Sequence, residues 1–161
     1  MRLSYPGSPR FAVVPAAYVV LRRDDGQVLM QRRHQTGYLD GHWAIGAAGH
    51  VEGGESVLDA ARREAREELG VGVDDLVPIT VMHRTVGSRR IDQRVDFFFE
   101  CRHWSGVPER REPDRASELR WVALDALPSP VVPHEQWVLQ RWRAGDIPIV
   151  STFGFSTVRR A

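Results

Sequence analysis

The 161-residue sequence contains no lysine, no asparagine and a single cysteine, Cys101. One cysteine excludes an internal disulfide bond, so we expect the chain in a reducing compartment, the cytoplasm. The 22 basic residues are therefore all arginine, and with 21 acidic residues they give a formal net charge of +1. This balance does not indicate a nucleic-acid polymer or a membrane surface as a partner. A GC-rich genome accounts for arginine at every basic position, so this bias carries no information about activity.

The sequence also lacks long apolar runs. The longest, from Phe11 to Leu21, contains Pro15 and is shorter than the roughly 18 residues that a membrane-spanning helix needs. No apolar run typical of a signal peptide follows Met1. Hydrophobic residues make up 42% of the chain, which is enough for one sizeable core. Because we find no repeat and no linker, residues 1–161 are predicted to form a single domain.

Apolar runs separated by turn residues predict more strands than helices. Asp25-Gly26, between the first two runs, is typical of a β-hairpin. Ser56 and Asp59 fit a capping box at the start of a helix, and Gly70 fits its left-handed end. The expected fold class is α/β (α+β), with a mixed sheet against which helices pack. Strands are expected over residues 11–21, 28–32, 80–86, 94–101 and 119–122, and helices over residues 56–69 and 135–143.

Three carboxylates lie on one face of the first predicted helix. Glu64 is three residues before Glu67 and four before Glu68, so their side chains are neighbours on a helix surface. They also lie near the end of the helix, where its dipole disfavours acids. Each close pair of like charges costs about 3 kcal/mol at ~5 Å and an effective dielectric of ~20, before screening. A solvated charged face would tolerate this cost, whereas a Mg²⁺ or Mn²⁺ ion would remove it.

A glycine-rich loop precedes this helix. It runs from Gly49 to Glu55 and contains three glycines and two acids. Glycine lets a backbone turn sharply and approach a ligand closely, so the loop can fold back and present carbonyl oxygens beside the carboxylates. An ordinary turn uses the same residues, so the loop by itself does not identify a site.

Together, the loop and the helix closely resemble the signature of the Nudix (MutT-like) hydrolase family. Ala65 is the one departure, because the signature usually has a larger aliphatic residue there. Further similarity, including Asp96-Phe97-Phe98-Phe99 and Trp121, extends the resemblance to residues 10–145. The resemblance implies a Nudix-type mixed β-sheet sandwiched between helices. The matching positions of the signature are Gly49, Glu55, Arg63, Glu64, Glu67, Glu68, Gly70 and the aliphatic Val71.

The resemblance also implies a reaction: hydrolysis of a nucleoside diphosphate linked to another moiety, by attack of water on phosphorus, with Mg²⁺ or Mn²⁺ as cofactor. Arg63 would hold a catalytic carboxylate in place, with Glu55 or Glu52 as its acidic partner. The general base stays unassigned among the glutamates, so the implied catalytic residues are Glu64, Glu67, Arg63 and Glu55. The implied metal-binding residues are Glu64, Glu67, Glu68, the carbonyl of Ala48 or Gly49, and Glu112 from outside the signature.

Residues outside the signature are expected to select the substrate. The candidates are Tyr38, His42, Arg84 and Arg90, because an aromatic face stacks on a nucleobase and an arginine fork binds phosphate oxygens. Trp43 begins an apolar, strand-like run, so we interpret it as a core residue.

The leading hypothesis for the substrate is a nucleoside triphosphate, or an oxidised one, cleaved to a monophosphate and pyrophosphate. A nucleotide sugar such as ADP-ribose is a closely related alternative. Residues 41–43 and 47–50 also resemble isopentenyl-diphosphate isomerase, which shares the fold but needs a catalytic cysteine in a loop where this chain has none. A third class is a non-catalytic nucleotide sensor, although such domains typically lose acids that this chain keeps. The small-molecule nucleotide is the only expected partner, bound by a monomer or a homodimer.

Overall fold

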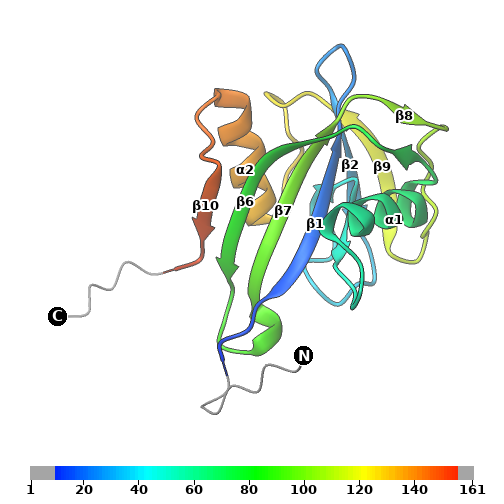
Figure 1. Ribbon diagram of the computed structural model, residues 1–161. Helices are drawn as coiled ribbons and strands as arrows, with labels where there is room; N and C mark the ends of the chain where they lie inside the picture. The colour runs from blue at the N-terminus through cyan, green and yellow to red at the C-terminus, as the bar shows by residue number, and fades with distance from the viewer. Residues whose placement is uncertain (1–9, 156–161) are drawn as a thin grey trace.

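The computed structural model describes residues 10–155, and its centre is a five-stranded mixed sheet (Figure 1). β7 pairs in parallel with β1, and β10 with β6, whereas β6–β7 and β1–β4 are antiparallel. The expectation of a mixed sheet is therefore confirmed. The prediction about a signal peptide after Met1 concerns residues outside the described range. The strand order is β10 (Val150–Phe153), β6 (Leu76–Thr85), β7 (Gln93–Cys101), β1 (Val14–Leu21) and β4 (Ala47–His50).

Two smaller sheets lie beside it. Gly26 has a left-handed φ of 86° and forms the tight turn expected at Asp25-Gly26. Beyond this turn, a bridge between Arg22 and Val28 connects the ends of β1 and β2. The two strands then enter different sheets, so only the turn and this one bridge of the predicted hairpin form. β2 (Val28–Arg33) lies between β3 (Trp43–Ile45) and β9 (Ala116–Val122), and β5 (Gly72–Val73) pairs with β8 (Trp104–Ser105).

The first helix, α1 (Val57–Leu69), begins and ends as predicted. The Ser56 hydroxyl accepts a hydrogen bond from the Asp59 N–H, and the Asp59 carboxylate accepts one from the Ser56 N–H. Gly70 ends the helix with a left-handed φ of 71°. The buried alanines of α1, Ala65 among them, let the helix pack closely on the sheet, in a cluster with Ala17, Val19 and Phe99.

The second helix, α2 (Pro133–Ala144), covers the other face of the sheet. Its buried Val138 and Leu139 pack with Tyr18, Met82 and Phe98 of β1, β6 and β7. The five-stranded sheet is therefore sandwiched between α1 and α2, as the resemblance implied (Figure 1). Among the described residues, neither helix is long and apolar enough to cross a membrane.

Several boundaries differ from the predicted ranges. β1 begins at Val14 because Phe11 is exposed rather than paired, and β6 begins already at Leu76. β9 begins at Ala116, and α2 begins at Pro133, which suits the first turn of a helix. The sequence did not predict β3, β4, β5, β8, β10 or the 3₁₀ helix η1 (Arg90–Asp92), because such short segments have too few residues to show a period.

Candidate active site

The C-terminal half of α1 packs its acidic face against β4. The carboxylate of Glu64 occupies the space in front of Gly49, where an added Cβ would lie 2.0 Å from Glu64 Oε1. Only 12% of the Glu64 side chain is exposed, and this burial raises its pKa. The signature glycine is therefore needed because any larger residue would displace this carboxylate.

Arg63 connects the loop to the helix through its guanidinium. It donates to both carboxylate oxygens of Glu55, at 2.7 and 3.2 Å, and to the carbonyl oxygen of His50 at 2.9 Å. Its Nη1 donates to Glu64 Oε1 at 2.6 Å and to Glu67 Oε2 at 3.1 Å. The planar fork of arginine is suited to such simultaneous contacts. Arg63 thus fixes two of the three helix carboxylates relative to the loop.

Glu55 is the acidic partner of Arg63 that the sequence left open between two residues. Glu52 instead donates its backbone N–H to Glu55 Oε1 at 2.8 Å. The hydrogen bonds from Arg63 and from this N–H lower the pKa of Glu55. Glu67, in contrast, has 54% of its side chain exposed, so it is the most accessible of the three helix carboxylates.

Glu68 is the most deeply placed of these carboxylates. Its Oε2 accepts hydrogen bonds from the Ala48 N–H at 3.0 Å and from Gln31 Nε2 at 3.2 Å. Burial raises the pKa of Glu68 to about 8, and the charges of Glu64 and Glu112 add to this effect. The neighbouring carboxylates therefore repel one another as the sequence predicted.

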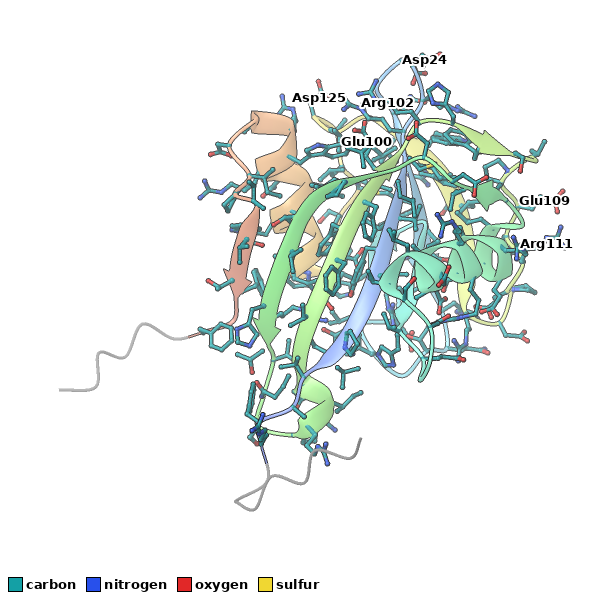
Figure 2. The ribbon with its side chains drawn as sticks, viewed as in Figure 1. Asp24, Glu100, Arg102, Glu109, Arg111 and Asp125 are labelled. Atoms are coloured by element: carbon teal, nitrogen blue, oxygen red, sulfur yellow. The ribbon has the colours of Figure 1, made fainter. Side chains whose placement is uncertain are left out.

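The segment before β9 brings Glu112 to this face. The N–H of Glu109 donates to the Leu69 carbonyl, and the N–H of Arg111 donates to the Glu68 carbonyl. These bonds satisfy carbonyl groups that a helix end leaves without partners. Figure 2 shows the side chains of Glu109 and Arg111 pointing outward beside α1. Glu112, the next residue, is half-buried and close enough to raise the pKa of Glu64.

The donor atoms gathered here suit a hard divalent cation. Carboxylates and a backbone carbonyl are the oxygen ligands that Mg²⁺ and Mn²⁺ prefer, and a cation would offset the repulsion around Glu68. Within residues 10–155, however, no three acidic, histidine or cysteine side chains are grouped closely enough to hold a metal as they stand. Arg63 draws Glu64 and Glu67 toward itself, so cation binding requires these side chains to reorient.

A cleft of about 850 Å³ opens beside these carboxylates. One side, which we call the acid wall, consists of Glu52, Glu64 and Glu68. Another part of the lining consists of Arg84, Arg94, His134 and Glu135, from β6, β7 and α2. We call this group, together with the buried Asp96 that pairs with both arginines, the arginine floor.

Hydrogen bonds order most of the arginine floor. Arg84 Nε donates to Asp96 Oδ2 at 2.6 Å, and both side chains are buried. Glu135 Oε2 accepts the N–H of Ile45 at 2.5 Å. Burial raises the pKa of Glu135 to about 8 and lowers that of His134 to about 2. Burial therefore disfavours the charged form of both groups.

Sequence reasoning found only one residue of the arginine floor, Arg84. Arg94, Asp96, His134 and Glu135 were not recognised as candidate site residues. Arg94 and Asp96 belong to a strand whose partners are distant in the sequence, so no local spacing marks them. Charged residues within apolar segments that form buried strands and helices could have indicated these site positions, because a buried charge needs a partner.

Two of the predicted substrate residues line the cleft. Tyr38 lies at its rim with 44% of its surface exposed, and the Arg33 guanidinium lies 5.4 Å from its ring centroid. Arg84 lies in the arginine floor, where its ion pair with Asp96 holds its side chain in a buried position.

The other two predicted substrate residues, His42 and Arg90, do not line the cleft. His42 precedes β3 and is half-buried. Arg90 begins η1, and the turn directs it differently from its neighbour Arg89, which lines the cleft and pairs with Asp92. Trp43 is buried, with 4% exposed, which confirms its interpretation as a core residue.

Comparisons with known proteins agree with this geometry. The uncharacterized Nudix hydrolase YfcD of Escherichia coli K12 is 32% identical over 123 residues, which cover 70% of this chain and 60% of that protein. An isopentenyl-diphosphate Delta-isomerase of Cereibacter sphaeroides KD131 is 35% identical over 112 residues, covering 68% and 63% of the two chains. The matches thus span less than two thirds of these relatives. The crystal structure of a MutT NUDIX hydrolase from Burkholderia pseudomallei superposes with a TM-score of 0.72 and 28% identity, covering 80% of this chain and 97% of that one.

Residues 13–142 match the NUDIX domain family. This range contains both the acid wall and the arginine floor, together with every strand except β10 and nearly all of the two helices. The chain therefore belongs to the NUDIX family.

Proposed function

We propose that the chain hydrolyses a nucleoside diphosphate linked to another moiety, with a nucleoside triphosphate or an oxidised one as the leading substrate and a nucleotide sugar as the alternative. One observation carries this proposal: the carboxylates of Glu64 and Glu68 lie against Gly49 and Ala48 of β4, at the side of a cleft large enough for a nucleotide. A polyphosphate would be repelled by these acids unless a cation lay between them.

The acid wall would hold a Mg²⁺ or Mn²⁺ ion through Glu64, Glu68 and the Ala48 carbonyl, with Glu67 and Glu112 as further ligands. The bound ion supplies positive charge that neutralises phosphate oxygens and polarises the phosphoryl group. Arg63 hydrogen-bonds Glu64 and Glu67 and is itself held by Glu55, so it would keep these carboxylates close to the ion after they reorient. Glu64 is the candidate for accepting a proton from the attacking water, because it lines the cleft and burial raises its pKa.

An isomerase reaction that depends on cysteine receives no support from the cleft. Cys101, the single cysteine of the sequence, is buried on β7 with its Sγ 3.0 Å from the His103 carbonyl oxygen. It packs in the cluster under α1 and does not line the cleft.

Product analysis tests the proposal. The protein is incubated in Mg²⁺ with nucleoside triphosphates, oxidised guanine nucleotides, nucleotide sugars and dinucleoside polyphosphates, and the products are resolved by chromatography. We expect cleavage of one class to a nucleoside monophosphate. The variant Glu64→Gln should be silent, whereas Glu118→Gln, the same change at an ion pair on β9, should retain activity. Survival of every compound would contradict the proposal.

A further inference from the structure

Two arginines lie directly opposite each other in the arginine floor. Arg84 of β6 pairs in register with Arg94 of β7. Arg84 is 4% exposed, and the Arg94 side chain is 13% exposed. Like charges at directly opposed positions destabilise a sheet, and burial increases the cost of an unpaired charge. Selection for stability alone does not explain this pair.

Asp96 compensates only one of the two arginines fully. Its Oδ2 accepts the short hydrogen bond from Arg84, whereas Arg94 Nε lies 3.7 Å from Asp96 Oδ1, too far for a hydrogen bond. Both of these atoms are buried without a hydrogen-bond partner. Within residues 10–155, the Arg94 guanidinium therefore leaves at least one of its five N–H donors unsatisfied.

Burial disfavours the charged forms of the other titratable groups of the floor. It raises the pKa of Glu135 to about 8 and lowers that of His134 to about 2. Tyr18 also stays neutral, because burial raises its pKa above the usual value. Within residues 10–155, Arg84 and Arg94 form ion pairs with one carboxylate, Asp96, and both arginines line the cleft.

We propose that Arg94, backed by Arg84, binds a second negatively charged oxygen group of the substrate, a phosphate or carboxylate beyond the phosphates held at the acid wall. This inference rests on the proposed function, and it narrows the substrate class to diphosphates that carry a further anionic group. The guanidinium fork matches both phosphate and carboxylate oxygens. The exposed side chains of Tyr38, Val86 and Ile91 also line the cleft and can cover an organic moiety.

Matched substrate pairs that differ by one negative group test the site. UDP-glucuronate against UDP-glucose adds a carboxylate, NADPH against NADH adds a phosphate on the sugar, and ATP against ADP adds a third phosphate. In Mg²⁺, we expect kcat/KM to favour the anionic member of at least one pair by about 10- to 100-fold, the scale of a charged hydrogen bond. The pair that shows the preference identifies the source of the group.

Variants then assign the preference to Arg94. Arg94→Gln should bring the ratio within the preferred pair close to one, and Arg94→Lys should restore part of it by keeping the charge. Arg102→Gln is the matched control, because Arg102 pairs with Glu100 at the end of the molecule near Asp24 (Figure 2). The control should retain the full ratio. A ratio that Arg94→Gln leaves unchanged would overturn the proposal.

A binding measurement separates this inference from the proposed function and does not depend on the variants folding. The ¹⁵N–¹H signals of the arginine Nε groups are followed while inorganic phosphate is titrated into the wild-type protein in Mg²⁺. We expect the Arg94 signal to shift in a saturable way. If no diphosphate is cleaved but this signal responds, the proposed function fails and the anion site stands. If diphosphates are cleaved without preference and the signal does not respond, the anion site is wrong and the function stands.

Discussion

The acid wall and the arginine floor lie on two sides of one cleft, and they differ in charge, burial and origin. The acid wall comes from one continuous stretch, residues 52–68, and gathers three carboxyl groups beside the cleft. The arginine floor is built from β6, β7 and α2, is almost fully buried, and holds two arginines that share the carboxylate of Asp96. Each side gathers groups of like charge that packing alone does not explain. The difference indicates a ligand with two anionic parts. One part would bind the acid wall together with a cation, and the other would bind the arginine floor directly.

The largest expected effect comes from the acid wall. Glu68→Gln should lower kcat/KM by about a thousandfold, because a cation ligand that acts on the reacting phosphates contributes several kcal/mol. The free energy of unfolding should not fall, because the substitution removes a buried carboxylate that like charges surround. Steady-state kinetics in Mg²⁺ and urea unfolding check both parts. Activity within tenfold of wild type would show that Glu68 is not a ligand.

The same chemical change in the arginine floor should act on pH-dependent stability. Folding raises the pKa of Glu135 from 4.5 to about 8, so the folded state binds the proton more tightly. This contribution to stability is fully present below pH 4.5 and is lost as the pH rises through about 8. Between pH 5 and pH 8, Glu135 should therefore cost the wild type about 3 kcal/mol of unfolding free energy.

Urea unfolding of Glu135→Gln at pH 5 and pH 8 measures this loss. The decrease in unfolding free energy from pH 5 to pH 8 should be about 3 kcal/mol smaller in Glu135→Gln than in the wild type. Glu118→Gln, on the exposed side of β9, should leave the decrease unchanged. An equal decrease in the wild type and in Glu135→Gln would show that folding does not raise the pKa of Glu135.

A smaller effect is expected from the residue that orders the acid wall. Arg63→Lys should lower kcat/KM by about 10- to 100-fold, because lysine keeps the charge but cannot contact Glu55, Glu64 and Glu67 together. Arg62→Lys is the matched control, since Arg62 faces Asp59 and Asp74 on the exposed side of α1. Equal kinetics for the two variants would show that Arg63 does not order the acid wall.

The smallest expected effect comes from a single methyl group. Gly49→Ala places a Cβ where the Glu64 carboxylate now lies, and we expect a loss in kcat/KM of about tenfold as this flexible side chain moves aside. Stability should change little, because the clash involves the end of a side chain. Gly53→Ala, where a Cβ meets nothing within 4 Å, should retain activity. Equal rates for both variants would contradict the close packing of Glu64 on Gly49.

The acid wall could be predicted from the sequence because its determinants are local. The spacing of Glu64, Glu67 and Glu68 on a helix fixes a common face, and the Ser56 cap and Gly70 fix the ends of that helix. The mixed sheet between two helices followed from the resemblance and is confirmed.

The arginine floor could not be predicted, because it depends on how distant segments pair. Arg84 and Arg94 become neighbours only through the register of β6 and β7. Glu135 becomes buried only when α2 packs on the sheet. For the same reason the sequence suggested Arg90, on the exposed turn, and missed Arg94.

The central claim, that the acid wall binds the divalent cation, is tested most directly by Mn²⁺ relaxation in ¹⁵N–¹H spectra. At substoichiometric Mn²⁺, we expect selective broadening of the N–H signals of Ala48 and Gly49. Excess Mg²⁺ should reverse the broadening, and Glu68→Gln should abolish it. Broadening confined to surface acids such as Asp74 and Asp75, with Ala48 and Gly49 unaffected, would contradict it.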